Sequence, residues 1–141
     1  MFVVDELNFL YENMREMPRI CGDILSHSSL MTQLINESLL NRDICVQRIV
    51  LLILDFLAQT MGTLPNGNGF KLFESINLLM RHERMLIRKY CIQLLADLTV
   101  MKGWNVSQSD RNALMASLKI YKNGVRNSKN AIAKIEAKLM N

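Results

Sequence analysis

The amino-acid sequence predicts an all-α protein, and three observations lead to this prediction. Apolar residues recur at helical spacing through most of the chain, and no segment alternates at strand spacing. Half of the residues are apolar but only 6% are aromatic, and ten are Met, a composition that suits helix-on-helix packing. Finally, the segment Arg42–Met61 is apolar on nearly every side. Such a segment predicts a buried helix that other helices surround.

The central segment is too long for a typical strand and contains no Gly or Pro. Twelve of the fifteen residues Ile44–Ala58 are apolar, and the exceptions, Gln47, Arg48 and Asp55, do not fall at strand spacing. A membrane span needs roughly 18 apolar residues. The longest uninterrupted apolar run here is six residues, Ile49–Leu54. We therefore expect a central core helix and no membrane partner.

The residues before the central helix predict two helical regions. Val4–Met17 carries apolar side chains at helical spacing, with Asp5 placed to cap its first turn. A second region runs from about Arg19 to Leu40, with a break expected near His27. Asn41 then stands where a residue could cap the central helix.

The residues after the central helix begin with a loop. Gly62–Gly69 contains three glycines, a proline and two asparagines, which marks a connection rather than an element. Helices are predicted over Phe70–Met80 and Glu83–Lys102, and Gly103 is placed to end the second of these.

The last part of the chain predicts a further helical pair. Ser107 should open a helix, with Asp110 three residues later in a capping-box-like arrangement. A kink or break is expected near Asn127, and helical spacing continues to Leu139. Together these elements predict one domain, residues 1–141, built as a compact stack of about six to seven helices. Helices of similar length joined by short turns resemble armadillo or HEAT repeats, although no repeat period is evident.

Residues suited to catalysis or metal binding are scattered. Cys21, Cys45 and Cys91 each have apolar neighbours, which predicts buried free thiols in a reducing compartment such as the cytosol or nucleus. His27 and His82 are not at ligand spacing from a cysteine or an acid. Gly62 and Gly67 have the spacing of a phosphate-binding loop, but Asn68 and Gly69 follow where that loop has Lys and Ser or Thr. We therefore expect no enzyme activity, no cofactor and no metal.

The distribution of charge is uneven along the chain. Residues 1–80 hold five Lys and Arg against nine Asp and Glu, a balance of −4. Residues 81–141 hold twelve against four, a balance of +8. Such a division predicts that the C-terminal half attracts an acidic surface.

Two sets of cations in this half are spaced to form ridges on helices. Arg81, Arg84 and Arg88 fall at i, i+3 and i+7, and the second set repeats this kind of spacing. The alternative is that these side chains only solvate the outer faces of amphipathic helices. Because acids are few here, we expect contact with an acidic surface. The full candidate set is Arg81, Arg84, Arg88, Lys89, Lys119, Lys122, Arg126 and Lys129.

Four aromatic residues are candidates for a protein interface. Phe2, Phe9 and Tyr11 belong to the first helix and are either core residues or a stripe that faces a partner. Trp104 lies at a helix junction, where it could anchor a partner or cap the core.

The C-terminal half resembles a known family over about Glu74–Leu139. The residues that carry the likeness are NLLMRHERMLIRKY, then CIQLLADLT, a break, and NVSQSDRNALMASLKIYKNGVRNSKN with a final amphipathic tail. This order is similar to the C-terminal helical domain of the regulatory, non-ATPase subunit of katanin, the microtubule-severing complex. Most members carry a propeller of WD repeats upstream. Since this chain has none, it resembles an excised domain or a short, propeller-less member of the meiotic type.

The resemblance implies a helical domain that binds the N-terminal helical domain of the catalytic AAA ATPase subunit. It further implies a contribution to microtubule binding, spindle-pole proteins as additional partners, and a cytoplasmic location on the spindle or centrosome. Severing would belong to the other subunit. Two alternatives stay open: an armadillo-like adaptor that grips a peptide, and a helical module that binds nucleic acid. No helix-turn-helix, zinc knuckle or aromatic stacking platform favours the latter, so no nucleic-acid partner is expected.

Overall fold

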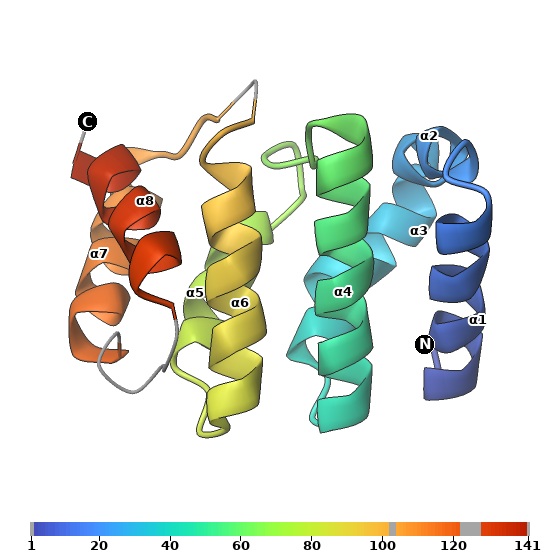
Figure 1. Ribbon diagram of the computed structural model, residues 1–141, viewed down its shortest axis with the longest axis horizontal. Coiled ribbons are helices and arrows are strands. Elements are labelled where there is room, and N and C mark those ends of the chain that lie inside the picture. Colours follow the sequence, from blue (N-terminus) through green and yellow to red (C-terminus); the bar gives the residue numbers. More distant parts are fainter. Residues whose placement is uncertain (1, 102–103, 122–127, 141) are drawn as a thin grey trace. The chain divides into compact units, whose positions relative to one another are not determined.

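The computed structural model describes residues 2–101, 104–121 and 128–140, and all the regular elements among these residues are helices joined by turns and loops (Figure 1). Within these residues there is no sheet, only one isolated bridge between Gly67 and Phe70. The all-α prediction is confirmed. The elements are α1 (Val4–Glu16), α2 (Ile20–Ser26), α3 (Ser28–Thr32), a π-helical turn η1 (Gln33–Glu37), a 3-10 turn η2 (Ser38–Leu40), α4 (Ile44–Met61), α5 (Leu72–Met80), α6 (Met85–Leu98), α7 (Gln108–Tyr121) and α8 (Lys129–Met140).

The described helices divide between two compact units. Unit 1 spans Met1–Leu72 and contains α1 to α4, whereas unit 2 spans Phe73–Asn141 and contains nearly all of α5 together with α6 to α8. The eight α-helices of the described residues exceed the six to seven expected, because the predicted region 19–40 is split into α2, α3, η1 and η2. That both units act as a single domain stays a prediction.

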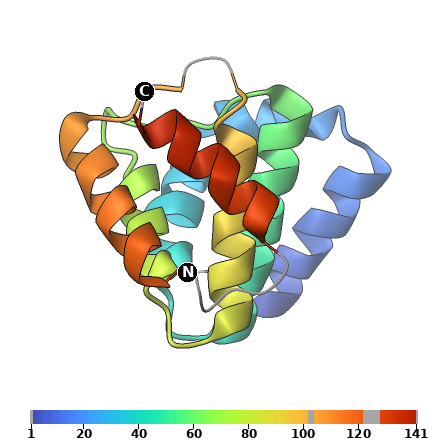
Figure 2. The same ribbon diagram turned by 60° about the vertical axis from the view of Figure 1, so that its left-hand side comes forward.

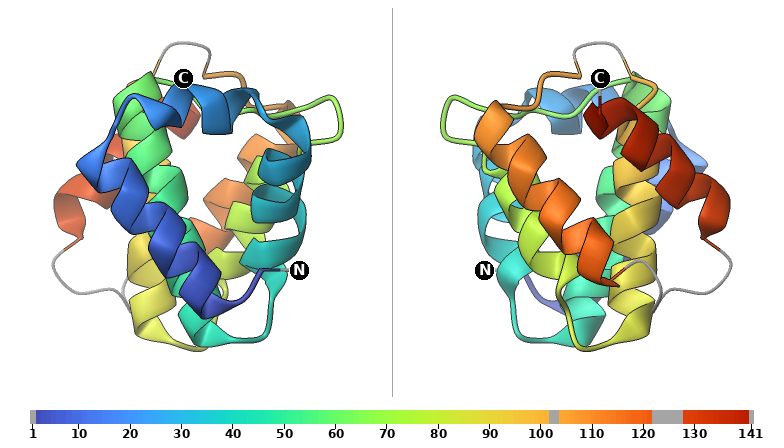
Figure 3. Two further views of the ribbon diagram at one scale, coloured as in Figure 1. Left: turned by 90° about the vertical axis from the view of Figure 1, so that its right-hand side faces the viewer. Right: turned by 90° about the vertical axis from the view of Figure 1, so that its left-hand side faces the viewer.

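Helix α4 is the buried central helix that the sequence predicted. It packs against α1, α2 and η2 within unit 1, and Figure 3 shows α1 lying beside it. Nine of its side chains are buried, from Val46 to Ala58. By length and composition alone α4 could cross a membrane, and no other helix of the described residues could. Core helices that other helices surround pass the same test, as α4 does here.

The ends of α4 show how local sequence sets its length. The Oδ1 atom of Asp43 accepts from the backbone N–H of Cys45 at 2.8 Å, so Asp43 is the N-cap. The prediction that Asn41 caps this helix was wrong, because the Asn41 side chain instead accepts from the N–H of Asp43 at 2.8 Å. Gly62 ends the helix with a φ of 75°, a left-handed conformation that glycine adopts without steric cost.

The start of α1 also differs from its prediction. Val3 is the N-cap residue, and the Glu6 carboxylate accepts from its backbone N–H at 3.3 Å. Asp5 lies in the first turn, where its negative charge stabilises the positive end of the helix dipole without capping it.

The region between α2 and α4 breaks where the sequence predicted. The Nδ1 atom of His27 accepts from the backbone N–H of Leu30 at 3.1 Å and thereby caps α3. The chain then widens into the π-helical turn η1, a rare geometry that is often found at functional or strained positions.

Asn36 on η1 holds the 62–69 loop in unit 1. Its Nδ2 group donates to the carbonyl of Gly69 at 2.7 Å, and its Oδ1 atom accepts from the N–H of Lys71 at 2.8 Å. Two hydrogen bonds from one side chain thus connect segments that are more than thirty residues apart in sequence.

Unit 2 consists of two helical hairpins, α5–α6 and α7–α8. Helix α8 packs against both α6 and α7, and Figure 2 shows it crossing α6. The buried Cys91 thiol of α6 donates to the carbonyl of Ile76 on α5 at 3.2 Å. Arg111 of α7 donates through Nη1 to the carbonyl of Leu139 near the end of α8 at 3.1 Å. As predicted, Ser107 caps α7, because its Oγ atom accepts from the N–H of Asp110 at 3.1 Å.

The Asn36 bridge generates a stability prediction. Asn36→Ala removes both hydrogen bonds, so we expect about 1–3 kcal/mol lower stability of unit 1 and faster amide exchange at Lys71. Asn36→Asp retains an oxygen for the Lys71 amide and should keep its exchange slow. Hydrogen exchange measured by NMR distinguishes these outcomes, with the exposed Asn8→Ala as control. Equal exchange at Lys71 in all three variants would contradict the bridge.

Candidate partner-binding surfaces

The first predicted ridge of cations does not lie on one helix. Helix α5 ends at Met80 and α6 begins at Met85, two residues later than the sequence predicted. Arg81 therefore lies in the connecting turn and Arg84 is the N-cap residue of α6. Only Arg88 and Lys89 are within the helix. The spacing i, i+3, i+7 thus produced no continuous face, because the helix that it assumed is interrupted.

Arg81 joins two helices of unit 2. Its Nε group donates to the Oγ atom of Ser117 on α7 at 3.0 Å, and this hydroxyl donates to Oδ1 of Asn77 on α5 at 2.6 Å. Ser117 is fully buried. A buried hydroxyl requires hydrogen-bond partners, so this arginine has a structural task in addition to its charge. Sequence reasoning missed the network because Asn77 and Ser117 are forty residues apart.

Arg88 is similarly engaged with the turn between α5 and α6. It is half-buried, and its Nη1 group donates to the carbonyls of His82 at 2.7 Å and Glu83 at 3.2 Å. The Nδ1 atom of His82 in turn accepts from the N–H of Arg84 at 2.9 Å. These bonds satisfy backbone groups at the start of α6, which has no side-chain cap of its own.

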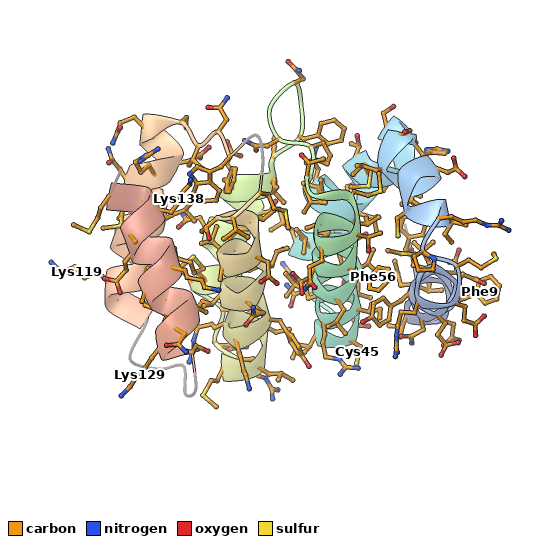
Figure 4. All side chains as sticks on the ribbon, turned by 45° about the horizontal axis from the view of Figure 1, so that its top comes forward. Phe9, Cys45, Phe56, Lys119, Lys129 and Lys138 are labelled. Carbon is orange, nitrogen blue, oxygen red and sulfur yellow. The ribbon has the colours of Figure 1, made fainter. Side chains whose placement is uncertain are left out.

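Three lysines of the candidate set are exposed: Lys89 on α6, Lys119 on α7 and Lys129 at the start of α8. Figure 4 shows Lys119 and Lys129 projecting outward from their hairpin. Lys119 also borders a hollow of about 350 Å³ between α7 and α8, together with Glu136. Lys122 and Arg126 lie outside the described residues.

The two units carry opposite net charge. Unit 1 has five Lys and Arg against eight Asp and Glu, a balance of −3, and unit 2 has twelve against five, a balance of +7. The uneven distribution seen in the sequence therefore coincides with the division of the structure, and each unit presents its own electrostatic character to a partner.

Two of the four candidate interface aromatics pack against their own unit. Tyr11 contacts Phe56 of α4 edge to face, with ring centroids 6.2 Å apart, and the Arg15 guanidinium lies 5.6 Å from the Tyr11 ring centre. Trp104 contacts Phe73 edge to face at 5.4 Å, and its ring nitrogen is buried without a partner. Both rings are half-buried, and their role in binding a partner stays a prediction.

Phe2 and Phe9 differ from the other two aromatics because they border a groove. The groove lies between α1 and Leu30 of α3 and has a volume of about 490 Å³. Phe2 is half-buried there, whereas Phe9 is 70% exposed. Figure 4 shows Phe9 on the outer side of α1, whereas Phe56 lies on α4.

The three cysteine thiols differ in their burial. Cys21 and Cys91 are buried, and burial raises the pKa of both thiols, although a hydrogen bond with Thr60 partly offsets the effect at Cys21. The prediction that every cysteine is buried was wrong for Cys45, which is exposed in the first turn of α4. No group of three or more His, Cys, Asp and Glu in the described residues could hold a metal ion.

Comparison of the chain with protein families, with curated proteins and with solved structures found no match.

The thiol environments predict selective alkylation. Cys45 should react with iodoacetamide in the native protein, whereas Cys21 and Cys91 should react only after unfolding, since their thiolates are disfavoured by burial. Mass spectrometry of peptides after timed alkylation measures this order. In Cys45→Ser the native chain should take up almost no label. Rapid labelling of Cys91 in the folded chain would contradict the buried position.

The hydrogen bonds of Arg81 predict that replacing it lowers the stability of unit 2 more than replacing Lys89 does. Arg81→Ala leaves the buried Ser117 hydroxyl without its donor, and we expect a loss of about 1–3 kcal/mol in the free energy of unfolding. The exposed Lys89→Ala should change it by no more than about 0.5 kcal/mol. Urea unfolding followed by the fluorescence of Trp104, the only tryptophan, reports on unit 2. Equal losses in both variants would contradict the structural role of Arg81.

Proposed function

We propose that the chain is a non-catalytic interaction domain of a katanin-like regulatory subunit. In this role it pairs with the N-terminal helical domain of an AAA ATPase subunit and contributes to microtubule binding and to targeting at the spindle or spindle pole. The observation that carries the proposal is the separation of charge: unit 2 has a balance of +7 while unit 1 has −3.

The lysines of unit 2 are the residues best suited to the polymer. Lys89, Lys119 and Lys129 are exposed and come from three different helices of the unit. The microtubule surface is strongly acidic, and a set of exposed cations is attracted to it over a distance that salt reduces to about 10 Å at 0.1 M. We expect Arg81 and Arg88 to contribute less to microtubule binding than the sequence predicted, because hydrogen bonds within unit 2 orient their guanidinium groups.

A binding role agrees with the environments of both histidines and of the Cys91 thiol. His27 and His82 each accept a backbone N–H through Nδ1. The Cys91 thiol is buried and donates to a carbonyl. A nucleophilic thiol is normally accessible and has a depressed pKa, whereas burial raises the pKa of this one. In the proposed complex severing is performed by the ATPase subunit.

The helical hairpins agree with an armadillo- or HEAT-like architecture. In unit 2, α5 and α6 form an antiparallel pair joined by the short turn at 81–84, and α8 packs antiparallel to α7. Antiparallel helix pairs are the building unit of such stacks. The same architecture supports the alternative function of a peptide-binding adaptor. The groove beside α1 is the feature that favours this alternative.

Cosedimentation with microtubules tests the proposal. The triple variant Lys89→Glu, Lys119→Glu, Lys129→Glu should weaken pelleting by roughly tenfold or more, since each exposed charge contributes on the order of 1 kcal/mol near an opposite one. Binding should also weaken with added salt and with tubulin whose acidic tails have been removed. Circular dichroism should show unchanged helix content.

A matched control makes the same change in net charge on unit 1. Arg19→Glu, Arg42→Glu, Lys71→Glu replaces three exposed cations there and should weaken pelleting clearly less. Equal losses in the two triple variants would mean that only net charge matters. Failure to pellet even when mixed with an ATPase subunit would favour the adaptor, and equal affinity for duplex DNA would favour a nucleic-acid partner.

A further inference from the structure

The groove of unit 1 combines an apolar interior with an acidic border. Leu7 forms its fully buried floor, while Leu10 on α1 and Leu30 on α3 are half-buried in its walls. Asp5 and Glu6 also line it, and both are exposed. Its volume of about 490 Å³ is in the range of sites that accept a bound group.

Large apolar side chains around this groove are left in contact with water. Phe9, which lines the groove, is 70% exposed, and Val3, the N-cap residue of α1, is 56% exposed. An exposed aromatic ring beside an apolar hollow gains free energy when a partner covers it, and such rings are common at the centres of protein interfaces.

The charge around the groove determines which partners it can accept. The exposed acids of α1 are Asp5, Glu6, Glu12 and Glu16. The cation of this helix, Arg15, lies 5.6 Å from the ring centre of Tyr11. An acidic polymer, an anionic membrane or a nucleic acid would be repelled here, whereas a cationic segment would be attracted.

The shape favours a helix as the bound segment. The groove is formed by side chains of two helices, so it presents no strand edge to which an extended peptide could add its backbone hydrogen bonds. A helix binds in such a groove through apolar residues at i, i+3, i+4 and i+7, with its charged residues at the border.

We propose that this groove binds an amphipathic helix of a partner protein, with bulky apolar residues on one face and Lys or Arg beside them. The bound apolar face covers Phe9 and fills the hollow above Leu7, while the cations lie against Asp5 and Glu6. The inference rests on the proposed role as a partner-binding subunit and assigns the chemistry of the partner helix. It makes unit 1 a receptor for a basic segment, in contrast to the cationic unit 2.

A displayed library of helical peptides tests the proposal on the full chain. All peptides share one face of Leu and Phe, and the positions beside it vary among Lys, Arg, Glu, Asp and Ser. Selection should enrich Lys and Arg beside the apolar face, and the affinity of an enriched peptide is then measured by fluorescence anisotropy. We expect Phe9→Ala to weaken it by about tenfold, as for a central interface residue.

The charge preference is tested by a reversal. Asp5→Lys with Glu6→Lys should make the same library enrich Glu and Asp instead. Matched controls on unit 2 are Val100→Ala, another apolar residue that is 75% exposed, and the exposed Glu83→Lys, and both should leave the affinity unchanged. No enrichment of basic over acidic peptides, or equal affinity of the Phe9→Ala variant, would overturn the proposal.

Sedimentation equilibrium tests whether a second copy of the chain, rather than a partner helix, occupies the groove. A dimer that the Phe9→Ala variant loses would overturn the proposal in favour of self-association. Because the library assay contains neither tubulin nor an ATPase subunit, its failure leaves the pelleting result intact. Conversely, a chain that binds the enriched peptide but does not cosediment with microtubules would contradict the proposed function and leave this inference intact.

Discussion

Burial of α4 is the constraint on which the structure of unit 1 depends. Nine side chains of α4 are buried, so neighbouring segments of unit 1 must cover most of its surface, while Cys45, Arg48 and Gln59 stay exposed on one side. Helices α1 and α2 and the turn η2 each pack against it. The chain between α2 and α4 must therefore bend sharply, and it does so through a capped break at His27 and through η1 and η2. Asn36 then secures the following loop.

In unit 2, arginine side chains hold several helices and turns together by hydrogen bonds, in addition to apolar packing. Arg81, Arg88 and Arg111 each donate to a group on another helix or on a turn. A guanidinium group has donors in several directions and keeps its charge, so it can satisfy a carbonyl or a hydroxyl and still contribute to a positive surface. Because these hydrogen bonds fix the guanidinium groups in place, fewer cations of this unit can reorient toward a partner than its net charge suggests.

The two units provide surfaces of opposite chemistry. Unit 2 presents lysines suited to an acidic polymer, and unit 1 presents an apolar groove with carboxylates at its border. A protein that binds a basic helix at one place and an acidic surface at another can connect two partners without its own charges competing for the same site. In the proposed complex, these two surfaces would bring the catalytic subunit and the polymer together.

The sequence by itself determined the helical class, the central helix and the uneven distribution of charge, because each of these depends on composition and on spacing along one segment. For Phe9 the sequence left a core position and a partner-facing position open, and the structure shows the side chain 70% exposed. Only the tertiary structure decided which arginines are engaged and where the groove lies. Ser117 approaches Arg81, and Leu30 approaches α1, across separations along the chain that no local pattern encodes. Local spacing could predict a ridge of cations, but the turn at 81–84 interrupts it, and the side chains then bind whatever polar groups the fold places beside them.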